Sequence, residues 1–217
     1  MRNRNLSPSN GFESLKWFWL LALALLLAGY LSGYFWSSHF SGELQPALAS
    51  LKNLASQIRR TQSVWHTFSS IFIHNVLAAF LMMLFGIGAG IFPAIMMWLN
   101  GLLMGFVTFL MVSHAHVPAW KVIVFGLLPH GIFELTALLW ASALGLQVGF
   151  AAIHSIWSLI RGGVRTASPS IRGPMSFRRE LKRSFVWFPA IVVLLLIAAG
   201  IESTVTPYLI HWSGLTS

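Results

Sequence analysis

The chain alternates between long apolar runs without charge and short segments that carry basic residues. A helix that spans a bilayer needs about 20 consecutive apolar residues, and five runs meet this length. The predicted membrane spans are residues 17–38, 68–88, 93–112, 129–150 and 184–207. This pattern predicts an all-α, polytopic transmembrane bundle that forms a single integral membrane domain over residues 1–217.

The region from Thr67 to Ser113 contains no Lys, Arg, Asp or Glu and is too long for one span. It therefore predicts two helices joined by a tight turn. We place the break at Gly86–Gly90, with Pro93 opening the next helix, because glycine and proline interrupt helices most strongly.

Three further segments are expected around these spans. Residues 43–66 have apolar side chains at helical spacing and predict an amphipathic helix, which lies on the membrane surface or serves as a solvated connector. Trp120–Leu128 predicts a short, re-entrant segment, because Pro129 should start a new helix or kink one. Residues 161–183 predict a basic loop.

Charge is scarce and mostly positive, with 14 Lys and Arg, 5 acidic residues and a net charge of +9. The basic residues flank apolar spans, so they predict contacts with anionic lipid headgroups and not with nucleic acid. Their excess in the N-terminal segment and in the 161–183 loop predicts an N-terminus inside and a C-terminus outside. The absence of Cys excludes disulfides, a thiol nucleophile and a Cys-ligated metal.

The polar residues inside the predicted spans are the candidates for a functional site. His130 and Glu134 are four residues apart and lie on one face of a helix. A carboxylate in a bilayer core costs about 2.5–3.5 kcal/mol, so Glu134 must face partners within the bundle. The predicted intramembrane polar cluster consists of His74, Asn75, Asn100, His130, Glu134 and Glu202.

This cluster has more than one interpretation. Imidazole and carboxylate ligands suit a divalent metal such as zinc, with His130, Glu134 and Glu202 as the ligands. Alternatively, the same groups form a hydrogen-bonded network that fixes helix register, with neighbouring carboxyls sharing a proton. Glu134 could also serve as a base for hydrolysis, although the HExxH order of zinc proteases is absent.

Small residues at four-residue spacing predict positions where helices pack closely. Gly29 and Gly33 in the first span should seat a neighbouring helix, and they are also the predicted face of a homodimer. The predicted packing positions are Gly29, Gly33, Gly86, Gly90, Gly101, Gly105, Ala137, Ala141 and Gly145.

Four motifs between about residue 70 and residue 207 are specific enough to indicate a family. They are, in chain order, His74-Asn75 followed by Gly86-x-Gly88-x-Gly90, then Asn100-Gly101-x-x-x-Gly105, then Pro129-His130-Gly131-x-x-Glu134-Leu135, and last Ala198-Ala199-Gly200-Ile201-Glu202-x-x-x-Thr206-Pro207. In these motifs the chain resembles the stage II sporulation protein M family of polytopic membrane proteins. The family pattern often has two consecutive asparagines in the first motif, and here the first of them is His74.

The resemblance implies a multi-pass protein of the cytoplasmic membrane. In spore formers it implies a scaffold for a cell-envelope complex that acts in engulfment with peptidoglycan hydrolases. Our first hypothesis is therefore a non-enzymatic scaffold with other envelope membrane proteins as partners. An ion- or proton-coupled transporter component and an intramembrane metal-dependent hydrolase remain as alternatives.

Overall fold

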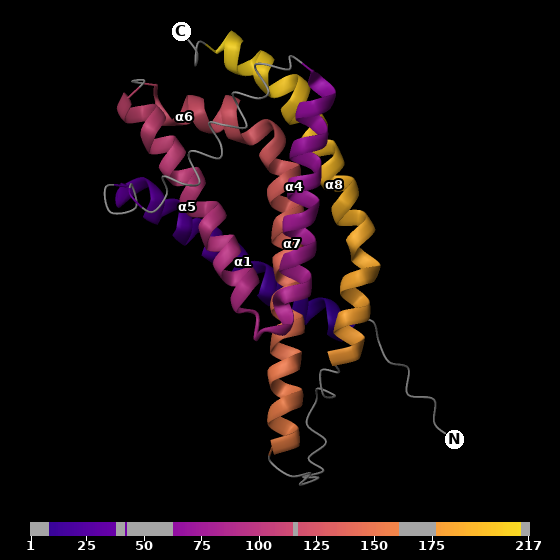
Figure 1. Cartoon of the computed structure of the whole chain (residues 1–217). Helices are drawn as coiled ribbons and strands as arrows, with labels where there is room; N and C mark the ends of the chain where they lie inside the picture. Colours follow the sequence, from indigo (N-terminus) through magenta and orange to yellow (C-terminus); the bar gives the residue numbers. More distant parts are fainter. Residues whose placement is uncertain (1–8, 38–41, 43–62, 115–116, 161–176, 214–217) are drawn as a thin grey trace.

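The computed structural model describes residues 9–37, 42, 63–114, 117–160 and 177–213, and within these ranges the regular structure is entirely helical (Figure 1). Its elements are α1 Ser9–Phe35, α4 Val64–Leu84, η1 Phe85–Ile87, α5 Ile91–His114, α6 Ala119–Lys121, η2 Val122–Leu127, α7 Leu128–Ile160 and α8 Phe177–Trp212. Five helical segments are long and apolar enough to cross a membrane. The prediction of an all-α polytopic bundle is confirmed.

The helices extend beyond several of the predicted spans. Helix α7 continues to Ile160, where the predicted span ended at residue 150. Helix α8 begins at Phe177, so residues 177–183, predicted as part of a basic loop, form its first turns. The loop prediction is wrong there because this stretch, although charged, contains no helix breaker. The rest of the predicted loop, residues 161–176, and residues 43–62 of the predicted amphipathic helix lie outside the described residues.

The turn between α4 and α5 falls where the glycines predict it. Helix α4 ends at Leu84 and passes through the short η1. Ala89 and Gly90 then take positive φ angles of 61° and 74°, a left-handed conformation that reverses the chain. Pro93 lies in the first turn of α5, where its missing N–H costs no helical hydrogen bond.

The predicted short segment at Trp120–Leu128 is helical and runs directly into α7. Helix α6 is followed by η2, a π-helical stretch, and Pro129 lies in the first turn of α7. In Figure 1, α6 lies across one end of the bundle and the chain then turns into the long axis of α7. Lys121 Nζ donates to the carbonyl oxygen of Ser213, 3.4 Å away, so the start of this segment lies beside the end of α8.

Helices α1 and α5 cross through glycines on both sides. A Cβ added at Gly29 would overlap the Trp98 carbonyl oxygen, and one at Gly33 would overlap that of Leu102. Conversely, a Cβ at Gly101 would overlap the Leu26 carbonyl oxygen. The backbones therefore touch directly, as in close-packed membrane helices. Because α5 of the same chain covers the Gly29 and Gly33 face, our location of a homodimer contact there is wrong.

A second close contact joins the α4–α5 turn to the middle of α7. A Cβ at Gly86 would overlap the Gly145 carbonyl oxygen, and one at Gly145 would overlap that of Met82. Ala141 and Ala137 are fully buried about one and two turns earlier on α7. Helix α7 thus lies at the centre of the bundle, with α4 and α8 along its sides (Figure 1).

Candidate intramembrane polar site

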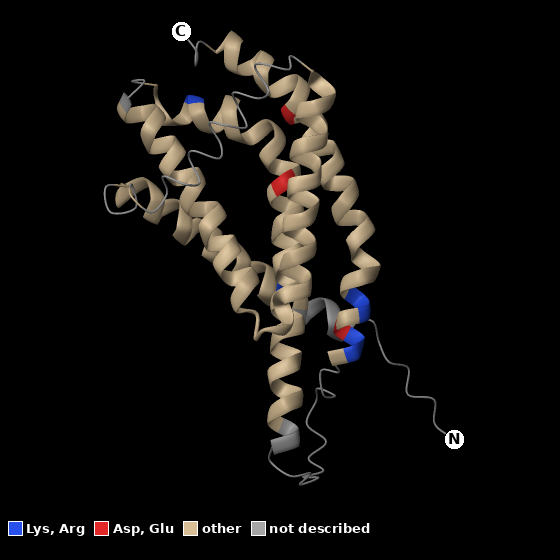
Figure 2. Ribbon diagram, in the orientation of Figure 1, with Lys and Arg blue, Asp and Glu red and all other residues tan. Residues whose placement is uncertain are grey.

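The site lies between the first turns of α7 and the last third of α8. His130 and Glu134 project from one face of α7, and Glu202 projects from α8. One ligand atom from each of the three side chains lies within 4.8 Å of the other two. Figure 2 shows acidic positions within the helical part of the bundle, away from the basic end of α8. The structure thus brings an imidazole and two carboxyl groups together from two helices.

Two hydrogen-bonding groups support these side chains. Asn75 on α4 is buried, with 8% of its surface exposed, and its side chain interacts with the Glu134 carboxyl. Thr206 on α8 is also buried, and its Oγ1 lies 3.3 Å from Nδ1 of His130. The site therefore draws on α4, α7 and α8 together.

Two predicted members of the cluster lie elsewhere. His74 is exposed on α4, although its neighbour Asn75 faces the site. Asn100 on α5 donates its side-chain amide to the Met96 carbonyl oxygen at 2.8 Å, a bond within its own helix. The charged and ligand-bearing part of the site is therefore His130, Glu134 and Glu202.

Sequence reasoning did not assign Thr206 to the site. Thr206 follows Glu202 by four residues on α8, so both lie on the same helix face. The same four-residue spacing separates His130 from Glu134 on α7. Applied to Glu202 on α8, this spacing would have predicted Thr206 as a member of the site.

The end of α8 carries two features that bend helices, and both lie close to its polar residues. Ser203 and Thr204 both donate their hydroxyls to the Gly200 carbonyl oxygen, at 3.1 and 2.6 Å. Such bonds to the preceding turn often bend helices. Pro207 lies within α8 and cannot donate to the Ser203 carbonyl. In Figure 1, the last turns of α8 lean over towards α6.

The leaning end of α8 and the π-helical segment cover each other next to the site. The rings of Phe125 in η2 and Trp212 in α8 pack edge to face with centroids 6.0 Å apart. Lys121 adds its hydrogen bond to Ser213. π-Helical stretches are frequent at functional sites, and this one ends three residues before His130 along the chain.

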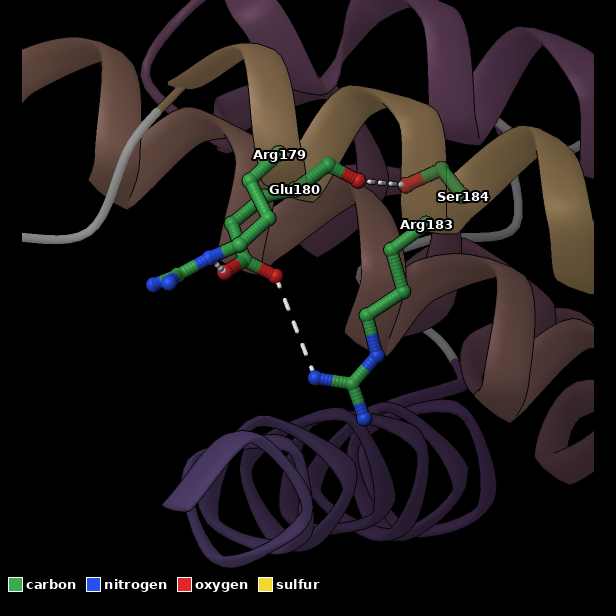
Figure 3. Close-up of polar contacts among 4 residues, drawn as sticks. All are labelled: Arg179, Glu180, Arg183 and Ser184. Atoms are coloured by element: carbon green, nitrogen blue, oxygen red, sulfur yellow. Dashed lines mark hydrogen bonds and ion pairs between the residues drawn. The ribbon is translucent and has the colours of Figure 1, made fainter. Parts of the chain in front are cut away.

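A third acid, Glu180, is buried and belongs to a different end of the molecule. It lies in the first turn of α8 and its carboxyl oxygens lie 3.4 Å from Arg179 Nε and 3.9 Å from Arg183 Nη1 (Figure 3). A carboxylate is favourable at this position because the N-terminus of a helix carries partial positive charge. With a rise of 1.5 Å per residue, Glu180 and Glu202 are separated by about 33 Å along α8, roughly the thickness of the hydrocarbon core.

Taken together, five helices long and apolar enough to cross a membrane define a polytopic membrane protein, and a polar cluster lies between two of these helices. The chain matches the family model of stage II sporulation protein M over residues 22–207 and belongs to that family. Comparisons with curated proteins and with solved structures gave no match.

Proposed function

We propose that this protein is a scaffold that assembles a cell-envelope complex in the cytoplasmic membrane, with its N-terminus inside. Membership of the stage II sporulation protein M family carries this proposal. In a spore former, the partners implied by the resemblance are peptidoglycan hydrolases of the engulfment complex.

The packing of the bundle is compatible with a fixed platform. Helices α1 and α5 touch through Gly29, Gly33, Gly101 and Gly105, and the α4–α5 turn touches α7 through Gly86 and Gly145. Contacts between backbones leave little room for sliding, because protein interiors are close-packed and deform poorly. A platform of this kind holds partners at defined positions.

Partner contacts require exposed surface, and the last turns of α7 supply one candidate. In Figure 1 this part of α7 extends past the other helices. Its exposed apolar side chains recur at helical spacing and are Phe150, Ile153, Ile156 and Trp157. An apolar helix face of this kind fits a partner helix in the membrane or at its edge.

Site-specific photo-crosslinking in native membranes tests the scaffold. A photoreactive residue replaces Trp157 at the end of α7, and a second variant carries it at Ile73, an exposed position on α4 that serves as the matched control. We expect envelope proteins to be trapped at position 157 in larger amounts than at position 73. Trapping of lipid alone at both positions would contradict the proposal.

A second candidate, an ion- or proton-coupled transport component, is favoured by the group of His130, Glu134 and Glu202. Titratable side chains inside a bundle are common on ion and proton paths. Purified protein in liposomes should then show a pH-dependent flux that Glu134→Gln abolishes. The scaffold proposal instead expects no flux, and unchanged crosslinking at position 157 in the Glu134→Gln variant.

A further inference from the structure

We propose that His130, Glu134 and Glu202 bind one divalent metal ion that fastens α7 to α8. The proposal goes beyond the scaffold function and does not depend on it. Zinc is the metal used to test it, because Zn²⁺ accepts one imidazole and two carboxylates as ligands. This set of three leaves the fourth coordination position for water. No sulfur ligand competes, since the chain has no Cys.

The positions of the three groups fit this chemistry. Their ligand atoms lie within 4.8 Å of one another, and Zn²⁺ binds nitrogen and oxygen at about 2.0–2.2 Å. Binding therefore requires the side chains to draw together by on the order of 1 Å, which their rotatable bonds permit. His130 and Glu134 come from adjacent turns of one helix, so α8 supplies the remaining ligand across the interface.

The hydrogen bonds around the site orient two of the three ligands. Nδ1 of His130 faces Thr206 Oγ1 at 3.3 Å, which leaves Nε2 to bind the metal. The Glu134 carboxyl interacts with the Asn75 side chain from α4. A metal-bound His almost always has a partner on its second ring nitrogen, and metal-bound carboxylates are likewise held by hydrogen bonds. Thr206 and Asn75 are in the positions of such partners.

Charge also favours a divalent ion. Two carboxylates that approach each other in a region of low dielectric repel strongly. Among the described residues, Asn75 acts on the Glu134 carboxyl and Glu134 acts on the Glu202 carboxyl, and neither is a cation. On α8 the described Lys and Arg residues lie in its first two turns, at the opposite end from Glu202. Lys121, which lies beside the end of α8, donates to the Ser213 carbonyl oxygen. A divalent cation neutralises the negative charge of both carboxylates. The alternative is that the two carboxyl groups share a proton.

The metal content of the full-length protein distinguishes a bound metal ion from a shared proton. The protein is purified in detergent on an affinity tag without histidine, stripped with chelator and dialysed against Zn²⁺. The variants are His130→Ala, Glu134→Gln and Glu202→Gln, and His74→Ala is the control because His74 is exposed outside the site. We expect one Zn²⁺ per chain in the wild type and in His74→Ala, and at least a tenfold loss of affinity in each site variant, since even the partners of metal ligands contribute about 10–100-fold.

A second measurement needs no variant and therefore does not depend on whether the variants fold. X-ray absorption at the zinc edge of the wild-type protein should report nitrogen and oxygen ligands with a single imidazole. Two or more imidazoles would place the zinc on other histidines and would overturn the assignment; the chain has eight histidines, His130 included. The proposal also fails if the wild type binds no Zn²⁺, or if His74→Ala loses as much zinc as the site variants.

Discussion

Nδ1 of His130 on α7 and Oγ1 of Thr206 on α8 lie 3.3 Å apart, and both residues belong to the interface between these helices. The contact joins positions 76 residues apart in the sequence. It ties the first turns of α7 to the part of α8 that Pro207 weakens. The polar site therefore also fixes how the two helices meet.

Replacing Thr206 with Val should weaken this interface. Valine keeps the shape of the side chain but removes the hydroxyl that faces His130. Hydrogen bonds between membrane helices contribute about 0.6–2 kcal/mol, so we expect the free energy of unfolding in bicelles to fall by about this amount. Thr204→Val is the matched control, because Thr204 is exposed on α8 and bonds its own helix. Equal losses in both variants would show that the His130 contact contributes nothing.

Alanine at Gly101 should destabilise the protein, whereas alanine at Gly200 should not. A Cβ at Gly101 overlaps the Leu26 carbonyl oxygen and must push α1 and α5 apart, which costs about 1–3 kcal/mol. A Cβ at Gly200 in α8 meets nothing within 4 Å, and alanine favours the helix by up to about 1 kcal/mol. Thermal unfolding of both variants in one detergent measures the difference. A Gly101→Ala variant as stable as the wild type would contradict the close α1–α5 crossing.

The sequence predicted the number of spans and the α4–α5 break because both depend on local signals. Uncharged length defines the spans, and Gly86–Gly90 with Pro93 marks the turn. The two GxxxG pairs at Gly29/Gly33 and Gly101/Gly105 were predicted as packing positions, but their partner was not. Which helix fills a glycine face depends on the three-dimensional arrangement, and here α5 fills the face that we assigned to a homodimer.

In the polar site, too, the sequence predicted what depends on local spacing and missed what depends on tertiary packing. The four-residue spacing of His130 and Glu134 places them on one face wherever that helix lies. The approach of Glu202 from α8 depends on tertiary packing that spacing alone does not encode. His74 and Asn75 are neighbours in sequence, yet only Asn75 faces the site, because successive residues on a helix point about 100° apart.

Arg183 should matter more to stability than Arg179, although both pair with Glu180. The Arg179 side chain is 65% exposed and that of Arg183 is 20% exposed, while Glu180 is 5% exposed. An exposed ion pair contributes about 0–1 kcal/mol. Loss of the more buried partner leaves the Glu180 carboxylate poorly compensated and should cost about 1–3 kcal/mol. The free energies of unfolding of Arg183→Ala and Arg179→Ala, measured in parallel, test this order. A larger loss of stability for Arg179→Ala would show that Arg179 is the more important partner of Glu180 (Figure 3).

The two ends of α8 should lie on opposite sides of the membrane, with the basic end inside. Arg178 and His211 are both exposed and are separated by about 50 Å measured along α8, well over the roughly 30 Å of hydrocarbon core that a span must cross. Figure 2 shows several Lys and Arg positions grouped at the first turns of α8, and an excess of such residues marks the cytoplasmic side.

Single cysteines test this orientation directly, because the chain has none of its own. A membrane-impermeant maleimide applied to intact cells should label His211→Cys and leave Arg178→Cys unlabelled until the membrane is permeabilised. Gly88→Cys, in the exposed turn between α4 and α5, should behave as Arg178→Cys does if the bundle has five spans. Labelling of Arg178→Cys in intact cells would show that the basic end of α8 lies outside, opposite to the proposed topology. Labelling of Gly88→Cys and Arg178→Cys on different sides would instead show that the segment between them crosses the membrane an odd number of times.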